Sequence, residues 1–508
     1  MSTSSPTIFH RFAGSVLLTL LRSIVIFSTG LILARWLGPS HYGSMTFLLA
    51  SMMAIKQVID LASSNAFFTF LSKKKRTFRF IRFYWLWLGI QFIVMIFLVK
   101  VLLPETSIEL FWNGENRNLV VLSFVAMFMQ NIAWNAAAQM AEANRKTIQL
   151  QKLNFVIVLI HLAVVIVLYL NDVLYVPILF ISIAIEWGIA SWVASKMYEP
   201  SDLILESETS KYIFQEFWVY CWPFLPYAFI GFAHDFIDRW MLQHWGGSIQ
   251  QAYFSVAQQF AAVALLATTS FLRIFWKEIA EAQHIGDFKK IERLFKMVSF
   301  GLFLIGALVS GGLLPWAKEI VTFLLGSAFT SGSFTLMLMF LYPVHQSLGQ
   351  IGGTILYATE NGKLQVRLGV VFLISNILFS YILLAPNAMK IPGFEMGSLG
   401  LSLKMVVMQI VNVNIMYWFI AKKFNWKFEW KFQYIILAFT VLFGWISKLA
   451  ITTIFAVNPI IMLILSLILY SLICFSLLYY SPSILGEEYH SIFKNFMSLT
   501  LKKLKTGS

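Results

Sequence analysis

The chain has 508 residues, of which 59% are hydrophobic and only 12% are charged, and its mean hydropathy is +0.75. Soluble domains carry about 25% charged residues, so this composition excludes an ordinary soluble protein and predicts one that crosses a membrane many times. The net charge of +14 does not indicate nucleic acid, because cytoplasmic loops of membrane proteins collect lysine and arginine. The two cysteines, Cys221 and Cys474, fall inside apolar segments, so we expect packing residues and neither a disulfide framework nor a metal cluster.

The apolar segments predict about fourteen transmembrane helices, since a helix needs about 20 residues to cross the hydrocarbon core. Twelve or thirteen spans are the alternative, because the pair within 153–197 is tightly spaced and the segment 214–242 is long. In that long segment, Pro223 and Pro226 should break the hydrogen-bond ladder and let the helix bend. The expected spans are 13–35, 42–68, 83–103, 118–140, 153–171, 174–197, 214–242, 252–276, 297–316, 333–358, 366–386, 398–421, 432–451 and 458–481.

The basic residues lie in alternate loops, and this pattern predicts the orientation of the chain. With the N-terminus in the cytoplasm, the inside loops hold most of the 38 lysines and arginines, including the run from Lys73 to Arg82. Both termini are therefore expected in the cytoplasm. The longest inside loop, 277–296, is expected to form an amphipathic helix on the membrane surface, and a solvated connector is the alternative.

The two halves of the chain contain a weak internal sequence repeat. The stretches ILARWLGPSHYG and DFIDRWMLQHWGG both end a span with Arg-Trp and continue into a turn that contains glycine. Arg35 then aligns with Arg239, and Tyr42 with Tyr253. The internal repeat predicts two halves related by a parallel repeat with a substrate site between them, and chance similarity among apolar helices is the alternative.

These segments resemble the Wzx-type oligosaccharide flippases, which are polysaccharide transporters of the multidrug/oligosaccharidyl-lipid/polysaccharide (MOP) exporter superfamily. The resemblance extends over nearly the whole chain. It is carried by LARWLGPSHYG with the later VIDLASSNAF, by WPFLPYAFIGFAHDFIDRWMLQHWGG with AYFSVAQQFAAV, and by the helix-ending tracts QMAEANRK and ILYATENGK. Ala62 departs from the pattern, because the family often has glycine after the Asp-Leu of the second span.

The resemblance implies an all-α polytopic fold with about 14 transmembrane helices. Two six-helix lobes, 1–200 and 201–425, would flank a V-shaped cavity like that of MATE transporters, and 426–508 would add two helices and a basic cytoplasmic tail. The implied activity is alternating-access movement of a polyprenyl-pyrophosphate-linked oligosaccharide across the cytoplasmic (inner) membrane of a bacterium. That activity would serve lipopolysaccharide O-antigen, capsule or exopolysaccharide biosynthesis.

The resemblance also implies the partners of the protein. These are the lipid-linked oligosaccharide, membrane lipid, a polysaccharide polymerase and a chain-length regulator, with no nucleic acid among them. No cofactor and no metal are expected. A proton or sodium gradient is a candidate driving force.

Five cations are candidate substrate-binding residues, because guanidinium and ammonium groups pair with phosphate. They are Arg22, Lys56, Arg239, Lys404 and Arg273. Arg22 lies near the middle of the first span, where a charge costs about 2.5 kcal/mol or more. Its structural alternative is an ion pair with Glu186, and the alternative for Arg273 is that it only follows the positive-inside pattern.

Four carboxylates are candidate coupling-ion sites, namely Asp60, Glu186, Asp235 and Asp238. Asp60 follows Lys56 by one helical turn, so the two side chains either neutralise each other or leave Asp60 to bind a proton or a sodium ion. Asp235 and Asp238 lie with His234 and Arg239 near the outer end of their span. That cluster is either an interfacial ion-pair network or a coupling site.

Catalysis is not expected from this sequence. A polyprenyl-dependent glycosyltransferase or polymerase would need a pair of acid/base groups or a metal site near the interface, and the short outer loops offer neither; nor is there a Walker A motif. Two other transport functions stay open. One is a cation-coupled multidrug exporter, which would favour an acidic, aromatic cavity, whereas Arg22 and Lys56 favour an anionic head group. The other is a peptidoglycan lipid-precursor flippase, which the sequence barely separates from an oligosaccharide flippase.

Overall fold

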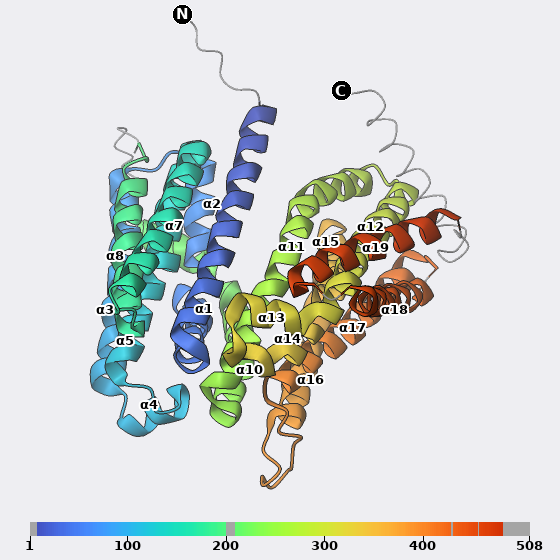
Figure 1. Cartoon of the computed structure of the whole chain (residues 1–508). Coiled ribbons are helices and arrows are strands. Elements are labelled where there is room, and N and C mark those ends of the chain that lie inside the picture. Colours follow the sequence, from blue (N-terminus) through green and yellow to red (C-terminus); the bar gives the residue numbers. More distant parts are fainter. Residues whose placement is uncertain (1–7, 200–208, 428–429, 456, 481–508) are drawn as a thin grey trace, which may run out of the picture. The chain divides into compact units, whose positions relative to one another are not determined.

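The computed structural model describes residues 8–199, 209–427, 430–455 and 457–480, and every regular element in these ranges is a helix (Figure 1). This is the expected outcome for an apolar chain in a bilayer, because a helix satisfies all of its backbone hydrogen bonds internally. The contacts divide the chain into two compact units, residues 1–252 and 253–508. The two lobes expected from the sequence, with a boundary near residue 200, stay a prediction.

Unit 1 contains ten α-helices and the start of an eleventh. Its elements are α1 (Ile8–Asp60), α2 (Ser63–Lys73), α3 (Phe78–Phe97), η1 (Leu98–Leu102), α4 (Glu105–Trp112), α5 (Arg117–Met127), η2 (Phe128–Ala133), α6 (Trp134–Ala143), α7 (Thr147–Leu170), α8 (Val176–Ser195), α9 (Ser210–Cys221), η3 (Trp222–Phe224), α10 (Leu225–Met241) and η4 (Leu242–Gly246). In this unit α1 packs against α5, α7 and α10, while α2 contacts α6 and α9.

Unit 2 begins within α11 and continues to the C-terminal end of the chain. Its elements are α11 (Gly247–His284), α12 (Phe288–Leu313), η5 (Leu314–Trp316), α13 (Ala317–Leu325), η6 (Ser327–Gly332), α14 (Ser333–Met339), α15 (Tyr342–Ala358), α16 (Gly362–Leu384), α17 (Gly397–Phe424), α18 (Lys431–Ile454) and α19 (Pro459–Tyr480). Here α12 packs against α15 and α18, and α17 packs against α15 and α16.

A buried apolar core fixes the spacing of α12, α15 and α17 in unit 2. Phe303, Leu348 and Ile351 are fully buried in it. The Tyr417 hydroxyl lies 3.0 Å from the Ser299 hydroxyl and 3.0 Å from the Leu348 carbonyl oxygen, to which it donates a hydrogen bond. These polar contacts hold α17 in register with both neighbouring helices.

The described residues contain eleven helical stretches that are long and apolar enough to cross a membrane. The first of them, Leu17–Asp60, covers most of two expected spans. The prediction of an all-α polytopic membrane protein is therefore confirmed, and the exact number of fourteen spans stays a prediction.

The two turns of the internal sequence repeat have the same backbone conformation. Gly38 turns the long helix α1 with φ 73° and ψ 170°, and Gly247 begins α11 with φ 76° and ψ 178°. Only glycine adopts these angles without strain, because a Cβ atom would clash with the backbone. The internal sequence repeat thus corresponds to a repeated turn between successive helices.

The two turns also pack closely against each other inside unit 1. A Cβ atom added to Gly43 would overlap the Ser248 carbonyl oxygen, and the hydroxyls of Ser44 and Ser248 are 3.1 Å apart. Only a residue without a side chain lets the two backbones come this close. The second half of α1 is therefore fixed against the start of α11.

Two expectations about helix boundaries are wrong and one is confirmed. The expected second span, 42–68, is broken after Asp60, where Leu61 and Ala62 have positive φ angles, and a new helix starts at Ser63. The expected surface helix 277–296 does not form, since α11 continues to His284 and α12 begins at Phe288. The proline break is confirmed: α9 and α10 are separated by η3, which contains Pro223.

Candidate functional site

Arg22 lies on the first half of α1 and is half-buried. Its Nε atom is buried and has no hydrogen-bond partner among the residues that the structure describes. An unmet hydrogen bond on a buried charged group costs at least about 1–3 kcal/mol, so such a donor is suited to binding an anion. Glu186, the expected structural partner, pairs with a different residue.

Glu186 on α8 is bonded to His161 on α7. The Glu186 Oε2 and His161 Nδ1 atoms are 2.8 Å apart, and the side chains are 8% and 16% exposed. The second oxygen, Oε1, is buried and has no partner among the described residues. Mutual pairing of this kind is how ionisable groups inside membrane helices are usually accommodated, and here it joins α7 to α8. Sequence reasoning missed the histidine because pairing between helices leaves no local pattern.

Asp60 lies at the break between α1 and α2, where it caps the second helix. Its carboxylate accepts hydrogen bonds from the Ser63 hydroxyl (2.9 Å), the Ser64 backbone N–H (2.9 Å) and the Ser64 hydroxyl (2.6 Å). Within the described ranges no ion pair joins Asp60 to Lys56, so the two groups do not neutralise each other by direct contact. Lys56 is half-buried on α1, one turn before this cap.

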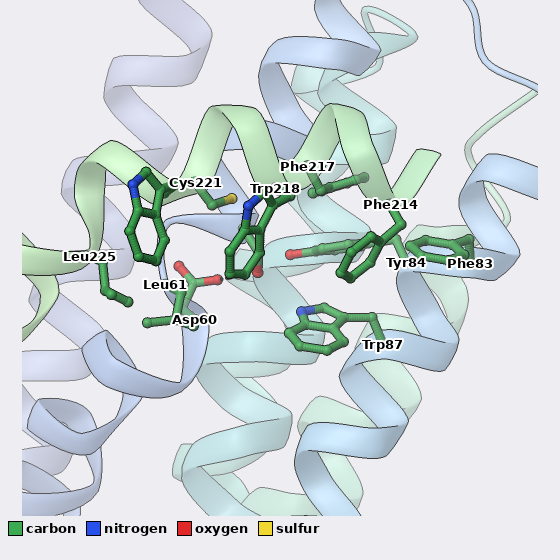
Figure 2. Close-up of a pocket in the computed structure, with 12 residues that line it drawn as sticks. Asp60, Leu61, Phe83, Tyr84, Trp87, Phe214, Phe217, Trp218, Cys221 and Leu225 are labelled. Carbon is green, nitrogen blue, oxygen red and sulfur yellow. Dashed lines mark hydrogen bonds between the residues drawn. The ribbon is translucent and has the colours of Figure 1, made fainter. Parts of the chain in front are cut away.

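A pocket of about 350 Å³ opens beside Asp60 in unit 1 (Figure 2). Most of its walls are aromatic: Tyr84 and Trp87 come from α3, and Phe214 and Trp218 come from α9, with their rings grouped around the carboxylate end of α1. The remaining lining residues are Leu61, Ser63, Phe83, Phe217, Cys221, Trp222 and Leu225. Aromatic faces attract organic cations, and here they lie beside a carboxylate whose oxygens accept hydrogen bonds from Ser63 and Ser64.

The cluster predicted on α10 joins that helix to α1. Asp235 accepts a hydrogen bond from the Gln57 side-chain amide at 2.5 Å, and its other oxygen is 2.9 Å from His234 Nδ1. Asp235 is 53% exposed, so this contact is open to solvent or lipid head groups. Asp238 and Arg239 also interact with their surroundings, and the charges near Arg239 include Asp238 and Asp235.

The remaining two candidates belong to unit 2. Lys404 on α17 is 2% exposed and is not without an interaction partner. Arg273 belongs to α11, but its side chain lies outside the described residues. The structure thus brings Lys56 and Asp60 close together on α1 and groups Asp235, Asp238 and Arg239 on α10, while Lys404 lies in the other unit.

The helical architecture is that of a multi-pass membrane protein, with ionisable groups inside several of its helices. Neither a family profile nor a curated protein sequence matches this chain. Among solved structures, lipid II flippase MurJ in an inward closed conformation superposes with a TM-score of 0.67, at 16% identity, over 92% of this chain and 99% of that one.

Two further structures belong to the MOP superfamily by their own descriptions. An inward-facing multidrug resistance MATE transporter matches with a TM-score of 0.55 at 13% identity, covering 79% of this chain and 95% of that one. A transporter from Pyrococcus furiosus, described as having a binding pocket of reversed polarity, matches with a TM-score of 0.53 at 13% identity, covering 81% and 94%. The chain therefore has the fold of MOP-superfamily transporters.

Proposed function

We propose that this protein is a flippase that moves polyprenyl-pyrophosphate-linked oligosaccharide across the cytoplasmic membrane of a bacterium by alternating access. Its product would serve a surface polysaccharide such as O-antigen, capsule or exopolysaccharide. The observation that carries the proposal is Arg22, whose buried Nε has no described partner, inside a fold shared with a lipid II flippase.

The physical argument starts from the head group of such a lipid. Sugars and pyrophosphate cannot cross hydrocarbon unaided, because each unsatisfied polar group costs several kcal/mol there, on the order of 2–7. A guanidinium offers two parallel N–H donors to phosphate oxygens, whereas the polyprenyl tail can stay in lipid throughout. Lys56, Arg239, Lys404 and Arg273 are the further candidates for the anionic group.

The two lobes, 1–200 and 201–425, would rock about the bound head group, with 426–508 as an added helix pair. The carboxylates Asp60, Glu186, Asp235 and Asp238 are proposed as proton or sodium sites that drive this motion. Glu186 is the best placed of them for a proton, because it is buried and contacts His161. A polysaccharide polymerase and a chain-length regulator would act on the product, and both chain termini would face the cytoplasm.

The test is a deletion strain in which lipid-linked oligosaccharide and surface polysaccharide are measured together. We expect the lipid intermediate to accumulate and the surface glycan to disappear, with rescue by wild type and by Arg82→Ala but not by Arg22→Ala. Arg82 is the matched control because it is an exposed cation. Normal levels of both molecules in the deletion strain would rule the proposal out. Accumulation of a peptidoglycan precursor instead would favour that related flippase.

A second candidate function, cation export, is favoured by one observation. The pocket beside Asp60 has an aromatic lining with Asp60 among its lining residues, and aromatic faces attract organic cations. The same deletion strain tests this function through its sensitivity to cationic dyes. Hypersensitivity that wild type rescues and Asp60→Asn does not would identify an exporter, whereas unchanged sensitivity would leave the flippase as the better interpretation.

A further inference from the structure

Unit 2 contains a second pocket, of about 470 Å³, between α11, α15, α16 and α17. Its most distinctive lining groups are side-chain amides, which come from three of these helices. They are Gln346, Gln350, Gln365, Gln409 and Asn412. The lining residues that the structure describes are amides, other small polar groups and apolar or aromatic side chains, with no lysine, arginine, aspartate or glutamate among them.

Amide side chains are rarely placed in apolar helices without a partner, because each buried donor or acceptor must be satisfied. In this pocket that requirement is not met. The side-chain oxygens of Gln350 and Gln365 are buried and accept no hydrogen bond from a described residue. Asn412 is half-buried, and its side chain makes no hydrogen bond to a described residue. Each of these amides offers a donor pair and an acceptor to a ligand.

A neighbouring asparagine on the same helix is bonded to another helix through its amide nitrogen. Asn414 donates to the Ile410 carbonyl oxygen at 2.9 Å and to the Gln433 side-chain oxygen at 3.2 Å, so its nitrogen joins α17 to α18, while its Oδ1 is buried and has no partner among the described residues. Asn412 lies two residues earlier on α17 and faces the pocket instead. Helix–helix bonding therefore explains Asn414 but does not explain Asn412.

The wall that α15 contributes includes two glycines one turn apart, and one of them is needed for a close approach. A Cβ atom at Gly349 would lie 2.7 Å from the Gln409 amide nitrogen, whereas one at Gly353 would lie 3.8 Å from the Gln365 amide nitrogen, an ordinary van der Waals distance. The missing side chain at Gly349 therefore makes room for the amide that reaches across from α17.

Two aromatic rings stand at the end of the pocket where α15 turns into α16. The rings of Trp276 and Tyr357 are nearly parallel, with an interplanar angle of 9° and centroids 6.1 Å apart. They are 43% and 49% exposed, so part of each ring is available to a ligand. Aromatic faces pack against the apolar C–H face of a sugar ring, while neighbouring amides bond to its hydroxyls.

We propose that this pocket binds an uncharged sugar of the transported head group. The inference rests on the proposed flippase function and assigns the recognition of sugar to unit 2, through the five amides and the rings of Trp276 and Tyr357. Recognition of the anionic pyrophosphate stays with Arg22. Different residues would therefore bind the sugar and the pyrophosphate, so a substitution can remove one of these two interactions without removing the other.

The experiment uses the lipid-linked oligosaccharide that accumulates in the deletion strain and the free saccharide released from it by mild acid. Binding of both to purified full-length protein in lipid nanodiscs is followed by tryptophan fluorescence and by equilibrium dialysis. We expect saturable binding of the free saccharide to wild type. Asn412→Leu and Gln350→Leu should each weaken it about tenfold, the loss expected when one or two hydrogen bonds disappear.

Two control variants separate a sugar site from a structural role. Asn414→Leu should lower thermal stability and leave the affinity for free saccharide unchanged, because its amide bonds only to α17 and α18. Arg22→Ala should also keep its affinity for the free saccharide while losing the lipid-linked form.

The possible outcomes bear on the sugar site and on the flippase function separately. If wild type does not bind the released saccharide, or if Asn412→Leu and Gln350→Leu bind it as wild type does, the pocket is not a sugar site. This result would leave the flippase function standing. If the deletion strain accumulates no lipid-linked saccharide, the proposed flippase function is wrong, and the sugar site, which rests on that function, is then wrong as well.

Discussion

Arg76 is the most revealing residue to change, because the sequence places it in an ordinary basic loop and the structure buries it. It is 2% exposed, and its guanidinium lies 2.6 Å from Glu216 Oε1 on α9. It also donates to the Phe70 carbonyl oxygen and stands 4.6 Å from the centre of the Phe80 ring. The loop between α2 and α3 is thus fastened to α9 by one side chain.

The expected loss for Arg76→Ala follows from these contacts. A hydrogen bond to a charged group contributes about 1.5–3 kcal/mol, and a cation–π contact about 0.5–2 kcal/mol. Glu216 is 22% exposed, so water screens part of the charge that remains behind. We expect a free energy of unfolding lower by about 3 kcal/mol, or a fall in Tm of roughly 6–12 °C for a unit of this size.

The assay is the fraction of detergent-solubilised protein that stays monodisperse after heating. Arg79→Ala is the matched control, because Arg79 belongs to the same basic run and is exposed. The double variant Arg76→Ala with Glu216→Gln should lose less than the sum of the single variants, since the second change removes the unpaired charge. Equal melting of Arg76→Ala and Arg79→Ala would show that the contact does not hold the loop.

Three further predictions concern the remaining contacts of unit 1. Gly43→Ala should destabilise the protein by about 1–3 kcal/mol, because its methyl group would meet the Ser248 backbone. Gly89→Ala on α3 is the control and should be neutral, because its methyl group meets nothing within 4 Å. Melting curves of the two variants check this. Glu186→Gln should flatten the pH dependence of transport in vesicles while binding of the lipid substrate persists, and an unchanged pH profile would remove Glu186 from the coupling sites. The hydrogen bond and charge of Lys146 lower the pKa of the Glu199 carboxyl below its usual 4.5. The stabilisation from the Lys146–Glu199 ion pair is therefore present above pH 4.5 and is lost as pH falls through the lowered pKa. Protease protection of the 144–147 turn should show that loss in wild type and not in Lys146→Ala.

Several features of this protein follow from the sequence alone. Hydropathy over 20-residue windows determines that the chain is a multi-pass helical membrane protein. In lipid the backbone N–H and C=O groups must bond to each other, and a helix built from an apolar segment of this length satisfies them internally. Local chemistry also determines the bend at Pro223 and the two turns at Gly38 and Gly247, since these depend on the backbone of the residues concerned. The matching letters around the two glycine turns are enough to indicate the repeat.

Tertiary structure alone decided the partners of the charged and polar groups. Glu186 pairs with His161 on the next helix, Asp60 caps α2 and makes no direct ion pair with Lys56 among the described contacts, and Arg76 is buried. The Gln and Asn side chains of the amide pocket come together from three consecutive helices, α15, α16 and α17. The physical reason is the same in each case. Periodicity along one helix predicts which of its residues share a face. Which residue of the adjacent helix lies opposite that face depends on the rotation and register of the adjacent helix, and these are set by the packing of the whole unit.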